Sequence, residues 1–167
     1  AEPQLRQLLK QVFDQLGIDV SKGAAGAEPP VDPDLLAATK AMDAGDYAEA
    51  RAAYERVLAR SPNDETAKIG LARVGLYERT QGLDPATVLR EAAEAPDDGA
   101  LQCRAADVEL RSGAVQAAFE RMVGLVRRTS GEERDKARLH LLGLFDTLPG
   151  DDPLVIKYRR ALANALF

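Results

Sequence analysis

The chain contains one cysteine and one histidine, Cys103 and His140, and these side chains are the best suited to nucleophilic or metal chemistry. A single thiol supplies neither an internal disulfide nor a thiolate zinc site, and the sequence has no Cys-x-x-Cys redox motif. Cys103 precedes Ala106 and Leu110 at helical spacing, which favours an inert apolar position over a reactive thiol. His140 lies between two leucines without a second histidine, a serine or a cysteine nearby, which favours a surface or groove-edge histidine over a catalytic one. We therefore expect no enzyme activity, no metal and no cofactor.

The composition and charge favour a helical protein that binds other proteins. Ala, Leu, Glu and Arg are abundant and aromatic residues make up only 5%, a mixture that suits closely packed helices. The formal net charge of −5 argues against nucleic acid, because phosphate binding needs clustered Lys and Arg. No signal peptide and no long apolar run is present, so we expect no membrane contact, and the lone cysteine fits a cytoplasmic location.

The first part of the chain is predicted to be separate from the rest. We expect an isolated amphipathic helix within residues 1–18, a linker over 19–33 that is rich in Gly, Ala and Pro, and a repeat domain over 34–167. The apolar face of the helix 3–16 comprises Leu5, Leu8, Leu9, Val12, Phe13 and Leu16. Such a face needs a cover, so we expect contact with residues beyond 35 or with a neighbouring chain, and the oligomeric state stays open. The chain begins at Ala1 inside this helical pattern, so we expect it to be a fragment of a longer protein.

From about residue 33 onward the sequence repeats. The alanines Ala38, Ala72 and Ala106 follow one another at 34 residues (38 to 72, 72 to 106), and Gly45 and Gly113 lie 68 apart, which is twice 34. Two helices of about 14 residues with two short turns fill such a unit, and each hairpin buries its apolar side only by stacking on the next. The sequence therefore predicts an all-α fold of about four stacked helical hairpins, with the small residues where helices approach closely.

The expected helices of this domain are 33–44, 47–60, 63–79, 84–95, 99–112, 114–129, 132–146 and 152–166. The second hairpin is irregular, because Arg79 occupies the position of the expected turn glycine and Gly82 follows three residues late. Its second helix is short, since Pro96 and the residues after it end the helical pattern.

The segment 45–62 carries a family motif. Gly45, Tyr47, Ala50, Tyr54 and Pro62 have the residue types and spacing of the second half of a tetratricopeptide repeat, which this segment resembles closely. The resemblance implies hairpins stacked in a short right-handed superhelix. It implies a scaffold for binding proteins and names no partner.

The carboxyl-terminal stretch is similar to a narrower family, the bacterial YbbN/CnoX-type proteins, which are thioredoxin-fold co-chaperones with a carboxyl-terminal tetratricopeptide domain. The matching residues are Arg134-Asp135-x-Ala137-Arg138, Leu142-x-Leu144-Phe145, Asp152-Pro153-Leu154-Val155, Tyr158-Arg159-Arg160-x-Leu162-Ala163 and Leu166-Phe167, and the opening Pro3-x-Leu5-x6-Val12 resembles the last helix of their thioredoxin domain. The resemblance implies a holdase or co-chaperone module that engages unfolded clients and possible partners of the chaperonin or Hsp70 type. Any redox activity would then belong to an upstream thioredoxin-like domain. The alternative is a generic scaffold for another protein complex.

The candidate partner-binding residues fall into two groups. The first lies on the inner face, or groove, formed by the first helix of each hairpin; it comprises Leu35, Thr39, Met42, Ile69, Arg73, Leu76, Tyr77, Asp107 and Arg111, with Cys103 and Leu110 beside them. Several of these side chains have a second interpretation, which is simple packing against a neighbouring helix. The second group, Tyr158, Arg159 and Arg160 on the last helix, is a docking surface by family resemblance or else part of an ordinary solvated face.

Overall fold

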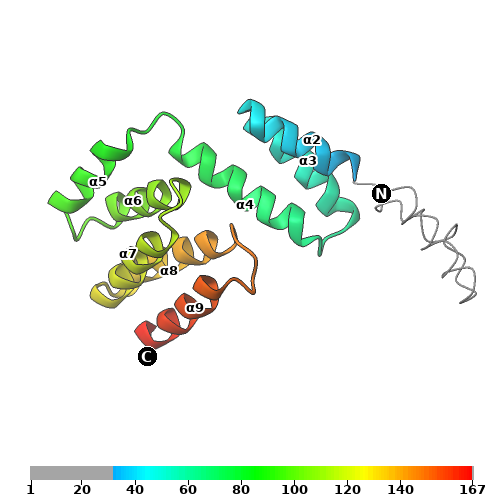
Figure 1. Cartoon of the computed structure of the whole chain (residues 1–167). Helices are drawn as coiled ribbons and strands as arrows, with labels where there is room; N and C mark the ends of the chain where they lie inside the picture. The colour runs from blue at the N-terminus through cyan, green and yellow to red at the C-terminus, as the bar shows by residue number, and fades with distance from the viewer. Residues whose placement is uncertain (1–31, 167) are drawn as a thin grey trace, which may run out of the picture. The chain divides into compact units, whose positions relative to one another are not determined.

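The computed structural model describes residues 32–166, and within that range all regular secondary structure is α-helical (Figure 1). Its elements are α2 (Pro33–Ala44), α3 (Tyr47–Arg60), α4 (Glu65–Thr80), α5 (Pro85–Glu94), α6 (Gly99–Arg111), α7 (Val115–Arg128), α8 (Gly131–Phe145) and α9 (Pro153–Leu166). The predicted all-α fold of helical hairpins is confirmed. The predicted helix within 1–18 and nearly all of the 19–33 linker lie outside the described residues. None of the described helices is long and apolar enough to cross a bilayer.

Aspartate caps decide where four of these helices begin. Asp46, Asp64, Asp84 and Asp98 each accept a hydrogen bond from the backbone N–H three residues later, at the start of α3, α4, α5 and α6. A cap of this kind contributes about 1 kcal/mol. The cap at Asp64 explains why α4 starts at residue 65 and not at the expected 63.

The turn glycines have the conformation that their spacing predicts. Gly45 and Gly113 follow α2 and α6 with φ angles of 73° and 86°, a left-handed region that costs glycine little. Gly82 follows α4 with a φ of 73°, so the late glycine ends the longer helix of the irregular second hairpin.

The helices pack in an order that departs from four identical hairpins. The pairs α2 with α3 and α6 with α7 pack side by side, and α4 contacts α3 and α6. Helix α5 packs against α6 and not along α4, while α9 packs along α7. Consequently Ala38 and Ala106 are fully buried as predicted, but Ala72 is only half-buried, because α5 does not cover α4 at that point.

Two large apolar clusters hold the described helices together. One belongs to α2, α3 and α4, and includes Ala38, Ala50 and Tyr54. The other joins α4, α6, α7, α8 and α9 around Phe119, whose ring contacts Phe145 edge-on with centroids 4.8 Å apart. The first cluster supports the pocket described next, and the second determines which side chains of the groove stay accessible.

Candidate functional site

A pocket of about 500 Å³ opens between α2, α3 and α4. The residues that line it are Thr39, Met42, Asp43, Tyr54, Thr66, Ile69, Gly70, Arg73 and Tyr77, and we call this the α2–α4 pocket. Five of the predicted groove residues, Thr39, Met42, Ile69, Arg73 and Tyr77, are therefore brought together at one place. The sixth from this region, Leu35, is half-buried against the first apolar cluster and does not line the pocket.

Tyr54 and Gly70, which both line the pocket, approach each other closely. A Cβ atom at Gly70 would lie 2.2 Å from Cζ of Tyr54, so the tyrosine ring rests directly on the helix backbone. Only glycine permits this contact without displacing the ring. At the rim, the rings of Tyr47 and Tyr77 lie 5.6 Å apart and restrict each other. The sequence placed Tyr54 in a repeat motif but gave no sign that its ring forms a wall of the pocket.

Two charged side chains of opposite sign line the α2–α4 pocket. Arg73 donates a hydrogen bond from Nε to the backbone oxygen of Thr147, at 2.9 Å, and this bond does not use the N–H donors of its two Nη groups. Asp43 is exposed on α2. The pocket therefore combines apolar surface from Met42, Ile69 and Tyr77 with one basic and one acidic group, which suits a peptide segment.

A second hollow, of about 480 Å³, lies beyond Ile69 between α4 and the turn that follows α8. It is more apolar in character, and its lining includes Leu71, Ala72, Phe145 and Leu148. Ala72 is accessible here because α5 packs elsewhere. We refer to it as the turn hollow.

Two predicted groove positions are core residues and cannot contact a partner. Leu76 is 4% exposed and Leu110 is 8% exposed, and both belong to the apolar cluster that includes Leu141 and Leu144 of α8. The packing interpretation is therefore the correct one for both. Arg111 donates from Nη1 to the backbone oxygen of Thr80, at 3.2 Å, so it caps the end of α4.

The lone thiol, Cys103, is partly buried against the same cluster. Burial, reinforced by the charges of Asp107 and Glu133, raises the pKa of Cys103 to about 11. The thiol therefore stays protonated at neutral pH and is a poor nucleophile, as its helical setting predicts.

Asp107 is the buried member of a polar cluster and does not lie on an open groove. Its carboxylate accepts two hydrogen bonds from Arg79 of α4, both at 2.9 Å, and lies 3.1 Å from Nε2 of His140 on α8. Because an ionised carboxylate only accepts, Nε2 is the donor. His140 lies 34 positions after Ala106, at a position of the repeat that small residues occupy in the earlier hairpins. Its longer side chain contacts Asp107 on α6. The single histidine thus joins α8 to α6, a role that its sequence position alone does not reveal.

The Asp107 cluster predicts a specific acid sensitivity. Burial acts to raise the pKa of the Asp107 carboxyl, but the hydrogen bonds from His140 and Arg79 outweigh it and lower the pKa below its ordinary value. A lowered pKa stabilises the fold above about pH 4, and this contribution is lost as the pH falls through the folded-state value. In urea unfolding, the wild type should exceed Asp107→Asn in stability at pH 6, and the gap should narrow below about pH 4. A gap of constant size from pH 6 to pH 3 would contradict this assignment.

The last helix presents only part of the predicted docking surface. Tyr158 is 4% exposed, packs against Phe119 and donates its hydroxyl to Glu120 at 2.7 Å, so it is a core residue. Burial, with the Glu120 hydrogen bond, raises the pKa of Tyr158 to about 12. Arg159 and Arg160 are exposed, and the guanidinium of Arg159 lies 5.9 Å from the centre of the Phe145 ring.

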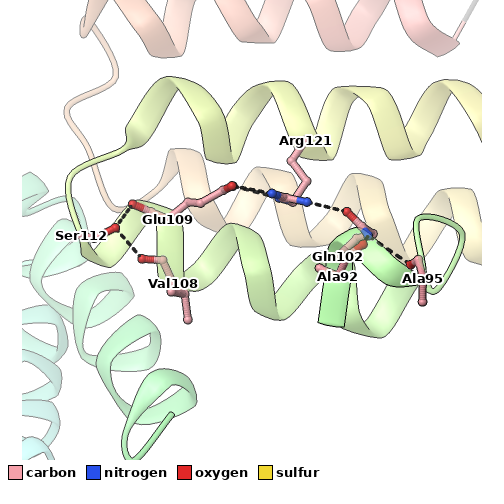
Figure 2. Close-up of polar contacts among 7 residues, drawn as sticks. All are labelled: Ala92, Ala95, Gln102, Val108, Glu109, Ser112 and Arg121. Atoms are coloured by element: carbon pink, nitrogen blue, oxygen red, sulfur yellow. Dashed lines mark hydrogen bonds and ion pairs between the residues drawn. The ribbon is translucent and has the colours of Figure 1, made fainter. Parts of the chain in front are cut away.

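A buried polar network, which the sequence did not predict, ties α5, α6 and α7 together. Figure 2 shows Arg121 of α7 between two side chains of α6, donating to both oxygens of Glu109 and, at 2.8 Å, to Oε1 of Gln102. Gln102 in turn donates to the backbone oxygens of Ala92 and Ala95, at 2.6 and 3.2 Å, at the end of α5. These groups border a hollow of about 510 Å³ between α5 and α7. The network satisfies the last carbonyls of α5 and therefore positions that helix on α6.

Comparisons with known proteins agree with this architecture. Two family profiles described as "Tetratricopeptide repeat" match the chain, one over residues 78–167 and the other over residues 41–75. Uncharacterized proteins of Mycobacterium bovis and of two Mycobacterium tuberculosis strains are 39% identical over 148 residues, which is 87% of this chain and 48% of each relative. The chain thus spans about half the length of these relatives. No solved structure matches it significantly.

Proposed function

Because the chain belongs to the tetratricopeptide-repeat family, we propose that it binds segments of other proteins in the α2–α4 pocket. The observation that carries the proposal is the convergence of Thr39, Met42, Ile69, Arg73 and Tyr77 on one accessible pocket of about 500 Å³. Its mixture of apolar surface with a few polar groups is typical of a peptide-binding site.

We further propose that the protein partner is an unfolded or partly folded client, and that the chain is the binding module of a co-chaperone. The resemblance of residues 134–167 to YbbN/CnoX-type proteins supports this role. The relatives are about twice as long as the chain, which leaves room for a further domain. On this proposal the remaining part of the protein contains a thioredoxin-like domain and works in the cytoplasm. A coding sequence that lacks a βαβ thioredoxin pattern outside residues 1–167 would contradict it.

Removing the aromatic rim should abolish most of the binding. An array of short peptides that tile a reduced, permanently unfolded protein would identify segments bound by residues 1–167. For the best of them, fluorescence anisotropy should show at least a tenfold weaker Kd for Tyr77→Ala, since an aromatic anchor in a pocket is worth about 1.4 kcal/mol or more. Tyr77 is half-buried and packs on Tyr47, so circular dichroism must confirm that the variant stays folded.

The matched control is Arg104→Ala, because Arg104 is exposed on α6 and does not line the pocket. Its Kd should equal that of the wild type. If Tyr77→Ala and Arg104→Ala bind alike, the segment binds elsewhere. If residues 1–167 bind only folded partner proteins and capture no peptide, the alternative role as an assembly scaffold is favoured.

A further inference from the structure

Helix α8 contacts α4, which lies two repeats earlier in the chain. In a stack of hairpins, the first helix of a repeat contacts its immediate neighbours. Here α8, the first helix of the fourth pair, contacts α6 and also reaches α4 of the second pair. The turn after α8 lies against α4 (Figure 1). In this turn Thr147 is 3% exposed, and its backbone oxygen accepts the hydrogen bond from Arg73.

The same helix covers the inner face of α4 and α6. Leu76 and Leu110, which the repeat assigns to the groove, are buried in one cluster with Leu141 and Leu144, both fully buried on α8. His140 is bonded to Asp107, another groove position. All three groove positions therefore contact, or share a core with, a helix of the same chain. Since these contacts belong to the main core, α8 covers this part of the groove as a packed element of the fold.

The part of the groove that stays open is short. The α2–α4 pocket extends along α4 from Thr66 to Tyr77, a distance of eleven residue-to-residue steps along the helix. At about 1.5 Å per helical residue this is about 16 Å, and an extended chain covers that distance in about five residues.

We infer that α8 and its following turn fill the carboxyl-terminal half of the groove, so that the protein accepts only a short extended segment of about five residues along α4. This inference rests on the proposed function and specifies its ligand. The apolar surfaces of Met42, Ile69 and Tyr77 favour an aromatic or large aliphatic side chain in that segment. The guanidinium of Arg73, which uses Nε for Thr147, favours an acidic residue beside it.

A length series tests the inference. The probes are capped, fluorescein-labelled peptides containing one, two or three copies of Gly-Leu-Phe-Asp-Gly, titrated with residues 1–167. After correction for the number of equivalent sites, the three Kd values should agree within threefold. For the wild type, replacing Asp by Asn in the single-copy peptide should weaken binding at least fivefold. For the Arg73→Gln variant, the same change in the peptide should leave the Kd unchanged.

Two variants keep the outcomes distinct. Leu139 is 59% exposed on α8 and Ala72 lines the turn hollow, so Leu139→Ser and Ala72→Glu probe the surfaces that a longer ligand would reach. Neither should change any Kd. The inference would be overturned if the corrected affinity rose tenfold or more from the single-copy to the three-copy peptide. The contradiction would be strongest if Leu139→Ser or Ala72→Glu removed this rise in affinity. If the peptide array yields binders but no designed peptide binds, the inference fails and the proposed function stands; if neither set binds, both fail.

Discussion

Replacing Phe119 by alanine should destabilise the described domain by about 3–5 kcal/mol, the range for a large aromatic side chain lost from a packed core. The Phe119 side chain is 0% exposed. Its ring lies 4.8 Å from that of Phe145 on α8 and 5.5 Å from that of Tyr158 on α9, centre to centre, and both contacts are edge-on. Alanine would leave a cavity where α7, α8 and α9 meet, because neighbours held by three helices relax little.

Urea unfolding followed by circular dichroism measures this loss, and amide hydrogen exchange locates it. Faster exchange is expected in α8 and α9, whereas α2 and α3, which belong to the other apolar cluster, should change less. Leu139→Ala is the matched control, since Leu139 is 59% exposed on α8 and should cost less than about 0.5 kcal/mol. A Phe119→Ala variant within about 1 kcal/mol of the wild type would show that this ring does not hold α8 and α9 in place.

Replacing Arg121 by methionine should cost about 3–5 kcal/mol, because it removes one partner of a buried ion pair and leaves the other unpaired. Arg121 bonds both oxygens of Glu109, whose side chain is 10% exposed, and it also bonds Gln102, which is 2% exposed as a residue. Methionine keeps most of the apolar volume, so the loss reports the charge and its hydrogen bonds. Helix α5 should exchange its amides faster, because Gln102 loses the group that orients its amide toward α5.

The surface pair Arg51 with Glu78 offers the comparison. Both side chains are 38% exposed, so Arg51→Met should cost no more than about 1 kcal/mol. Adding Glu109→Met to Arg121→Met should recover part of the stability, since the unpaired buried carboxylate disappears. Equal losses for Arg121→Met and Arg51→Met would mean that water reaches the network of Figure 2 freely.

The helices could be located from residue order because their signals are local. The glycines Gly45 and Gly113 and the aspartate caps act over one or two turns of chain, and the interval of 34 residues repeats such local signals from one hairpin to the next. Where the prediction differed, the cause was also local, since the side chain of Asp64 accepts from Ala67 and starts α4 later than expected.

The part of the candidate site that α2, α3 and α4 form was predictable from the sequence. Thr39, Met42, Ile69, Arg73 and Tyr77 line the pocket because α2, α3 and α4 pack in the regular order that the repeat implies. The other candidates depended on neighbours that the repeat does not specify. Leu76 and Asp107 are buried where α8 packs on α4 and α6, and Tyr158 is buried because its own helix, α9, packs along α7. The period alone gives no means of distinguishing a covered helix face from an open one.

Residue order alone therefore specifies an all-α repeat, its turns and the inner face of its first two units, since propensity, capping and periodicity act over short distances. The three-dimensional packing decided which part of that face stays open. Contacts such as His140 with Asp107 and Arg79 with Asp107 join residues 33 and 28 positions apart, and they depend on how far each helix turns about its own axis. That rotation results from many side chains packing at once, so no short stretch of sequence encodes it.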